Sequence, residues 1–146
     1  MKGNDWPFGD FGSAGAGKLE NGGGNLTLSD GAGVYFITAN TNDLTWTNYT
    51  INSWGLLGDA TPNGWDSDQN MTYDAATGIW SVTVDLVPGK IKFRANDDWA
   101  VNLGDRNNDG TLEIGGDHIP LQTAGNYTVL LDVSVGGNWS YSLKKN

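Results

Sequence analysis

The stretch Ile79-Trp-Ser-Val-Thr-Val-Asp85 decides the fold class of this 146-residue chain. Apolar and polar residues alternate along it, so Trp80, Val82 and Val84 are expected on one face and polar side chains on the other. This alternation is typical of a β-strand that is buried on one face only. Such a strand needs partner strands, and the neighbouring sequence supplies them.

Shorter segments on both sides repeat the alternation. Lys90-Ile-Lys-Phe-Arg94 is expected to turn Ile91 and Phe93 inward and to gather its three basic residues on the opposite face. Further strands are expected at Trp54 to Leu57, Tyr127 to Asp132 and Trp139 to Leu143. Turn-forming Gly, Asn and Asp residues separate these segments. The spacing predicts an all-β, immunoglobulin-like antiparallel sandwich over residues 51–146, with Trp80 and Trp139 in its core.

Residues 1–50 read as a partial copy of this module. Three pairs of segments match at one constant offset: Lys2-Gly-Asn-Asp-Trp6 with Arg94-Ala-Asn-Asp-Asp-Trp99, Leu19-Glu20 with Leu112-Glu113, and Gly22-Gly23 with Gly115-Gly116. The match continues, one residue out of step, from Gly33-Val-Tyr35 to Gly125-Asn-Tyr127. Residues 1–50 are therefore expected to supply only the closing strands of a preceding module, around Leu26 to Leu28, Val34 to Ala39 and Leu44 to Tyr49.

A half module of this kind leaves one sheet face and one strand edge without cover, and neither is well tolerated in water. Three arrangements would relieve this exposure. The half module packs on the complete module, pairs with another chain, or is partly disordered.

The composition excludes several classes of function. The formal net charge of −9 disfavours nucleic acid and anionic membrane surfaces as partners, because both repel negative charge. No stretch is apolar enough to cross a bilayer, so direct membrane insertion of these residues is not expected. The absence of cysteine excludes disulfides, cysteine-ligated zinc and thiol catalysis.

No catalytic residue stands out. His118 is the lone histidine, and no serine in a nucleophile motif lies beside it, so a structural or surface role is expected. Glycoside hydrolysis needs two acids that flank one cleft, and nothing singles out such a pair among the seventeen acidic residues. The sequence therefore predicts a protein that is not an enzyme.

The tryptophans are more informative. Trp65 lies in a loop of turn-forming residues, and Trp99 follows Asn96-Asp-Asp98, so both are expected on polar segments. Exposed tryptophans are costly unless a flat, partly apolar ligand docks on them, and a sugar ring fits this description. Lys92, Arg94 and Asn96, with Asp97, would supply the hydrogen bonds to the hydroxyls. A lid over a small core is the alternative, and the residues alone support both interpretations equally.

The segment from Asp105 to Asp109 resembles the opening of a calcium-binding loop, because Asp, Asn and Asp alternate there and Gly110 follows. The twelfth position is Gly116, where an EF-hand needs a bidentate Glu. The aligned stretch of the first copy has lost the ligand pattern. A polar hairpin turn is therefore favoured over a calcium site, and no metal or other cofactor is expected.

Four segments together resemble the carboxy-terminal modules of the SusE/SusF family, which are surface lipoproteins of the outer membrane in Bacteroidota glycan-utilisation systems. The segments are Leu57 to Asp66, Gly89 to Asp105, Leu112-Glu-Ile-Gly-Gly116 and Gly125-Asn-Tyr-Thr-Val129. The resemblance covers residues 51–146 and, through the repeat, makes residues 1–50 the tail of a preceding module. It implies an extracellular location on the outer membrane, with other glycan-utilisation surface proteins as partners.

The resemblance also implies a binding site. In starch-binding members an aromatic pair cradles the glucan and a basic side chain bonds its hydroxyls, which implies Trp65 and Trp99 as the cradle with Lys92 as the basic partner. Arg94 and Asn96 lie close by in the sequence. In the half module only Lys2, Asn4 and Trp6 have counterparts, so its site is expected to be incomplete.

Two functional hypotheses follow from the sequence. The first is non-catalytic binding of an oligosaccharide or polysaccharide at the cell surface, with starch or maltooligosaccharides as the first guess. The alternative is a structural or self-assembling protein, in which residues 1–50 of one chain are completed by strand addition from another. The truncated repeat favours assembly, and the tryptophan loops favour binding.

Overall fold

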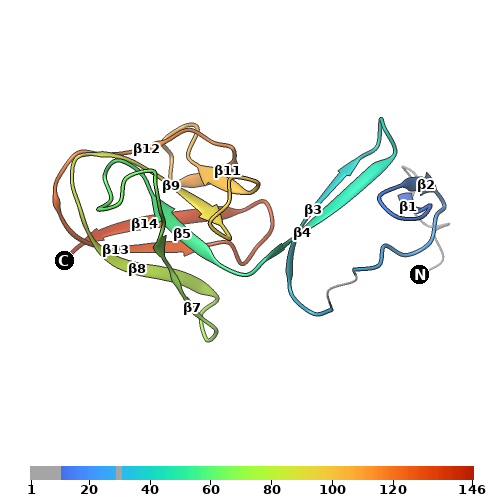
Figure 1. Ribbon diagram of the computed structural model, residues 1–146, viewed down its shortest axis with the longest axis horizontal. Helices are drawn as coiled ribbons and strands as arrows, with labels where there is room; N and C mark the ends of the chain where they lie inside the picture. Colours follow the sequence, from blue (N-terminus) through green and yellow to red (C-terminus); the bar gives the residue numbers. More distant parts are fainter. Residues whose placement is uncertain (1–10, 29–30) are drawn as a thin grey trace. The chain divides into compact units, whose positions relative to one another are not determined.

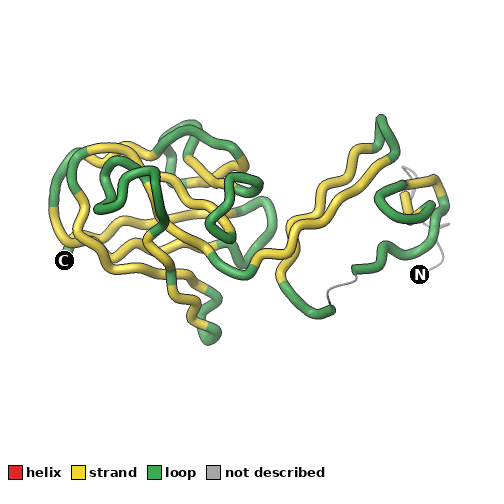
Figure 2. The backbone as a smooth tube through the Cα atoms, viewed as in Figure 1, coloured by secondary structure: helices red, strands yellow, loops and turns green. Residues whose placement is uncertain are grey.

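The computed structural model describes residues 11–28 and 31–146, and these residues contain strands and turns but no helix (Figures 1 and 2). The chain divides into two compact units, Met1–Ile51 and Asn52–Asn146. The expected all-β class is confirmed.

The larger unit is an antiparallel sandwich of two sheets. The first sheet contains β6 (Gln69–Asn70), β5 (Trp54–Leu57), β9 (Gly89–Ala95) and β10 (Asn102–Gly104), and β12 (Ile119–Leu121) also pairs with β9. The second sheet contains β7 (Thr72–Asp74), β8 (Ile79–Leu86), β13 (Gly125–Asp132), β14 (Trp139–Lys145) and β11 (Thr111–Ile114). Pairing between β10 and β11 joins the two sheets, so the sandwich is nearly closed (Figure 1).

The core lies between the two sheets and follows the alternation of the strands. On the inner face of the second sheet, Val84 of β8 lies opposite Tyr127 of β13, and both are buried. The largest fully buried side chains are Phe93, Leu56, Leu57, Leu86, Ile91, Leu103, Ile119, Leu131 and Val129. Burying apolar surface of this kind contributes about 25 cal/mol per Å² to folding.

Trp80 and Trp139 are less deeply placed than the sequence suggested. Each stands at or beside the first residue of its strand, β8 or β14, and each is half-buried. The Trp80 ring packs against Tyr73, with 5.0 Å between ring centroids. Their position near strand ends explains why neither ring reaches the centre of the core.

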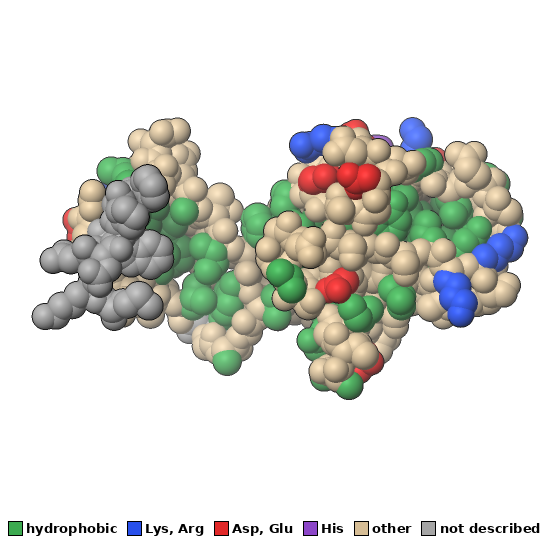
Figure 3. Space-filling view, turned by 180° about the vertical axis from the view of Figure 1, so that it is seen from behind, with side chains coloured by type: hydrophobic (Ala, Val, Ile, Leu, Met, Phe, Trp, Pro, Cys, Tyr) green, Lys and Arg blue, Asp and Glu red, His purple; other side chains and the backbone are tan. Residues whose placement is uncertain are grey.

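The smaller unit repeats part of the larger one strand by strand. Its hairpins are β1 (Phe11–Ser13) with β2 (Leu19–Asn21) and β3 (Val34–Asn40) with β4 (Thr45–Ile51). A bridge between Lys18 and Thr45 joins β2 to β4, in the same way that Thr111 of β11 pairs with Ser140 of β14. The order β1-β2-β4-β3 therefore matches β10-β11-β14-β13. Hydrophobic side chains reach the surface of this unit (Figure 3).

Two local features recur in both copies. A Cβ atom added at Gly104 would overlap the backbone at Gly116 and Asp117, and one added at Gly12 would overlap the backbone at Gly23 and Gly24. The Tyr127 hydroxyl donates to the Thr123 carbonyl at 2.8 Å, and the Tyr35 hydroxyl donates to the Gly31 carbonyl at 2.7 Å. A tyrosine that bonds back to the preceding backbone is the corner found in immunoglobulin-like sandwiches.

The expected strand at Leu26 to Leu28 is wrong. These residues have no regular secondary structure, whereas their counterparts form β12. β12 exists because it pairs with β9, and the described residues of the smaller unit include no counterpart of β9. A segment that lacks its partner strand has nothing to hydrogen-bond as a strand.

Replacing Gly104 by Ala tests the close backbone approach in the larger unit. We expect Gly104→Ala to lower the free energy of unfolding by about 1–3 kcal/mol, because the new methyl group forces the backbone apart. Gly136→Ala is the matched control, since a Cβ there meets open space, and it should change stability by no more than about 0.5 kcal/mol. Urea unfolding followed by circular dichroism measures both, and equal effects would contradict the packing described here.

Candidate functional site

The site is built on β9, which is buried on both faces. Ile91 and Phe93 point into the core, while Lys92 and Arg94 lie on the other face and are almost completely buried. The division of faces follows the predicted alternation. The burial of the two basic side chains is a correction, because a direct role in bonding a ligand requires them to be open to solvent.

A tight turn at the end of β9 positions Trp99. Asn96 and Asp97 both have positive φ values, 55° and 54°, and the Asp98 N–H donates to the Ala95 carbonyl at 3.0 Å. Two successive residues of this kind form a type I′ turn, which Asn and Asp tolerate better than most residues. The turn leaves the Trp99 side chain 46% exposed.

A compact loop between β5 and β6 positions Trp65. The Gly58 N–H donates to the Gly64 carbonyl at 2.9 Å, and the buried Thr61 hydroxyl donates to the Gly58 carbonyl at 2.8 Å. These bonds close the loop on itself, so Trp65 is presented from a braced segment. Its side chain is half-buried.

The rings of these two loops meet. The centroids of Trp65 and Trp99 are 6.2 Å apart, and their planes are tilted by 33°. The exposed His118 packs edge-on against Trp65, with 4.9 Å between ring centroids. The Arg94 guanidinium carbon lies 5.1 Å from the centroid of Trp99, which is within the range of a cation–π interaction. The three rings therefore form one aromatic surface above β9.

An ion pair lies beneath this surface. The Arg94 Nε–H donates to Asp68 Oδ1 at 2.7 Å, and the Asp68 side chain is fully buried. Burial raises the pKa of Asp68 above its ordinary value, and this outweighs the lowering by Arg94; the negative charge of Asp97 adds to the rise. The other carboxylate oxygen, Oδ2, has no hydrogen-bond partner among the described residues.

Lys92 shares the same covered face. Burial lowers the pKa of its ammonium group, and the negative charge of Asp117 partly offsets this effect. Asp117 immediately precedes His118, so the segment that enters β12 brings both a counter-charge and a ring to the site. The exposed Asp117 faces solvent while its charge acts on the buried lysine.

Asn96 has a structural role. Its side-chain oxygen accepts hydrogen bonds from the backbone N–H groups of Asn52 and Ser53, at 2.8 Å and 3.1 Å. These bonds hold the chain as it enters β5. The oxygen is thus already used in the absence of any ligand.

The structure brings together Trp65, Trp99 and Arg94, and it places Lys92 two residues away on the same face of β9. The sequence did not indicate Asp68 or Asp117 as site residues. For His118 it predicted only a structural or surface role. No periodicity marks these three residues, because each lies in a loop or at a strand boundary. The matching residues of the first copy, Lys2, Asn4 and Trp6, lie outside the described residues.

The loop that opens with Asp105 uses its carboxylates internally. Asp105 Oδ1 accepts the Asp109 N–H at 3.1 Å, and Oδ2 accepts the Gly110 N–H at 2.9 Å and the Tyr141 hydroxyl at 3.0 Å. The Arg106 N–H donates to a Glu113 carboxylate oxygen at 2.9 Å. This is the geometry of a polar hairpin turn. No group of three or more His, Cys, Asp or Glu side chains suited to a metal ion occurs in the described part of the chain.

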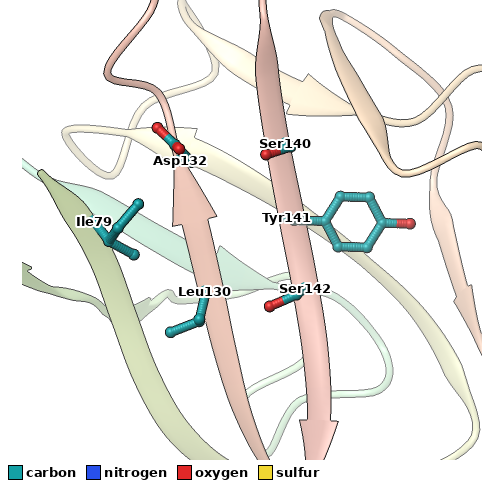
Figure 4. A pocket seen from close by; sticks show the side chains of 6 residues that line it. All are labelled: Ile79, Leu130, Asp132, Ser140, Tyr141 and Ser142. Atoms are coloured by element: carbon teal, nitrogen blue, oxygen red, sulfur yellow. The ribbon is translucent and has the colours of Figure 1, made fainter. Parts of the chain in front are cut away.

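A shallow hollow of about 180 Å³ lies elsewhere, on the outer face of β8, β13 and β14. Its walls include Ile79, Leu130, Asp132, Ser140 and Ser142, while the Tyr141 ring points to the opposite face (Figure 4). No aromatic ring faces this hollow among its lining residues. A flat ligand would find a stacking surface at Trp65 and Trp99 but not here.

Comparison with known proteins adds no assignment: the chain matches no protein-family model and no curated protein. The described residues contain no helix that is long and apolar enough to span a membrane.

Removing Arg94 tests the ion pair. We expect Arg94→Met to lower the free energy of unfolding at pH 7 by about 3–5 kcal/mol, because it leaves the Asp68 carboxylate buried without a partner. Arg106→Met is the matched control, since Arg106 is exposed, and its effect should stay within about 0.5 kcal/mol. Urea denaturation measures the free energy of unfolding of both variants. If Arg94→Met loses no more stability than Arg106→Met, the ion pair is refuted.

The Asp105 loop predicts a pH dependence. Burial would raise the pKa of Asp105, but the hydrogen bonds from Gly110, Asp109 and Tyr141 prevail and hold it below its ordinary value of 3.8. Its ionised form therefore stabilises the fold above pH 3.8, and this contribution is lost as the pH falls through the lowered pKa.

We expect Asp105→Asn to cost about 1–3 kcal/mol of stability at pH 7, because hydrogen bonds to a charged acceptor are lost. The difference from wild type should shrink as the pH is lowered below 3.8. Thermal unfolding followed from pH 7 down to about pH 2 measures this difference as the acid side of the titration is approached. A difference that is constant across the range would contradict the assignment.

Proposed function

We propose that residues 52–146 bind an oligosaccharide or polysaccharide, without cleaving it, on the surface formed by Trp65, Trp99 and His118. One observation carries the proposal: two tryptophans from separate, braced loops lie with ring centroids 6.2 Å apart, and Trp99 keeps 46% of its surface exposed. A lid over a core would hide both rings, whereas a stacking surface needs at least one of them open.

The chemistry of a sugar suits this surface. One face of a pyranose ring presents C–H groups, which pack on an indole, while its hydroxyls need hydrogen-bond partners around the edge. The planes of Trp65 and Trp99 are tilted by 33°, so a curved chain would follow the two rings better than a flat one. This tilt supports starch or maltooligosaccharides as the first guess.

The charged residues take two different parts in this proposal. Arg94 is buried with its guanidinium group against Trp99 and helps to hold that ring, and Lys92 is buried on the same face of β9, so both offer the ligand little exposed surface. Asp97, Asp117 and His118 are exposed, and in this proposal they are the groups that would bond the hydroxyls. A set of acceptors and an imidazole suits a neutral glycan, because carboxylates would repel an acidic one.

The burial of the Asp68 carboxyl group supports binding without hydrolysis. Asp68 is the carboxyl group at this site whose pKa is raised, as a general acid requires, but its side chain is fully buried beneath Arg94. It cannot reach a glycosidic bond. The resemblance to SusE/SusF modules supports the same class of function, and the location on the outer membrane and the partnership with other surface proteins are part of this proposal.

Titration with maltoheptaose, followed by a panel of soluble glycans, tests the site through tryptophan fluorescence and calorimetry. We expect a dissociation constant in the range of about 1 μM to 1 mM, which corresponds to roughly −8 to −4 kcal/mol. Trp65→Ala and Trp99→Ala should each weaken binding at least about tenfold, a loss of about 1.4 kcal/mol, because each removes a stacking ring.

Tyr73→Ala is the matched control, since Tyr73 is an exposed aromatic residue on β7 that packs on Trp80. It should bind as wild type does. Circular dichroism checks that each variant is folded. No binding to any glycan of the panel, or equal losses in Trp99→Ala and Tyr73→Ala, would refute the proposed site.

A further inference from the structure

Three acidic residues lie within two positions of a ring of the aromatic surface in the sequence, and all three are exposed. They are Asp66 beside Trp65, Asp97 before Trp99, and Asp117 beside His118. Two of them also act on the buried charges of the site, since Asp97 acts on Asp68 and Asp117 acts on Lys92. The site therefore combines aromatic rings with exposed negative charge.

These three carboxylates differ from the other acidic side chains of the larger unit. Every other one accepts at least one hydrogen bond from an N–H or hydroxyl group of the same unit. Asp85, for example, accepts a side-chain N–H of Asn126 at 2.7 Å. Asp66, Asp97 and Asp117 accept no such bond from the described residues. Their oxygens are available to a donor from outside the chain.

The basic residues of the site do not supply that donor. Arg94 is buried and bonds Asp68 at 2.7 Å, and Lys92 is buried as well. Lys90, the exposed basic residue of β9, forms no ion pair with a carboxylate of the described residues. The exposed charge next to the rings is therefore mainly negative, and a ligand with a positive charge would complement it.

We propose that the aromatic surface prefers glycans that carry protonated amino groups, such as glucosamine oligosaccharides, over neutral glycans of the same length. The inference rests on the proposed function, because it assigns a ligand class to the same surface. An ammonium group has three donors and no acceptor, which complements carboxylates that lack a donor. It is also attracted to the face of an indole, as the Arg94 guanidinium already is at 5.1 Å from the centroid of Trp99.

An amino sugar offers something to both kinds of group at the site. Its ring presents C–H groups that stack on an indole, and its amino group presents N–H donors at the edge of the ring. The net charge of −9 adds a long-range attraction for a cationic chain. The same carboxylates that repel an acidic glycan therefore favour an amino glycan over a neutral one.

Calorimetry on the full chain tests the preference with two hexasaccharides of the same linkage. One is the hexamer of glucosamine and the other is the hexamer of N-acetylglucosamine, so they differ only in ammonium against acetamide groups. At about pH 5.5 the amino groups are protonated and the carboxylates are ionised. We expect the glucosamine hexamer to bind about tenfold tighter at roughly 10 mM salt. This affinity ratio should fall towards one at about 1 M salt, where exposed charges are screened.

Single-charge variants test which carboxylates act. Asp66→Asn and Asp97→Asn should each lower the affinity ratio by about two- to fivefold, because each removes one ion pair with the ligand. Asparagine tolerates the positive φ of 54° at position 97, so the turn before Trp99 is kept. Asp85→Asn is the matched control, since it removes the same charge from an exposed position on β8, and it should leave the ratio unchanged.

Spermine separates a preference for amino sugars from a general attraction of polycations to an acidic protein. It carries amino groups but no sugar ring, so it should bind at least about tenfold more weakly than the glucosamine hexamer. Equal affinities for spermine and the glucosamine hexamer would overturn the inference, because the sugar ring would then contribute nothing.

Failure of this inference and failure of the proposed function give different results. Equal affinities of the two hexamers at low salt, or equal changes of the ratio in Asp66→Asn and Asp85→Asn, would overturn the preference and leave glycan binding in place. If neither hexamer binds and the panel of soluble glycans does not bind either, the proposed function fails and the preference fails with it.

Discussion

The need to bury two cationic side chains shapes the larger unit around β9. Removing an ammonium or guanidinium group from water costs several kcal/mol unless counter-charges and good packing compensate for it. Asp68 pairs with Arg94, Asp117 offsets the burial of Lys92, and Trp99 covers the guanidinium. Each compensating group comes from a different loop. The covered face of β9 thus fixes the positions of the loops that carry the aromatic surface.

Local contacts hold both tryptophan rings in place. The Trp99 ring lies over Arg94, the Asn96-Asp97 turn fixes the chain just before it, and the closed loop from Gly58 to Gly64 braces Trp65. A surface that is organised before the ligand arrives loses less conformational entropy on binding. In the proposed function, Arg94 would therefore act indirectly by holding the Trp99 ring, and the exposed neighbours would contact the ligand.

Sequence patterns predicted most of the larger unit because its strands alternate and its turns are rich in Gly, Asn and Asp. The repeat was also visible, and the paired close approaches at Gly12 and Gly104 give it a structural basis. Two predictions were wrong because the pattern of a segment reveals neither its partner strands nor where the strand ends. Leu26 to Leu28 has strand composition but no partner strand, and Trp80 has core spacing but stands at a strand end. The site role of Asp68 could not be predicted from the sequence, because it depends on an ion pair with Arg94, which lies far away in the sequence.

The most direct test of the account follows the indole N–H signals of the tryptophans by nuclear magnetic resonance during a titration with maltoheptaose and the other glycans. We expect the signals of Trp65 and Trp99 to shift together and saturate, while that of the buried Trp54 stays in place. Signals of Trp65 and Trp99 that stay fixed for every glycan, or shifts confined to other tryptophans, would contradict it.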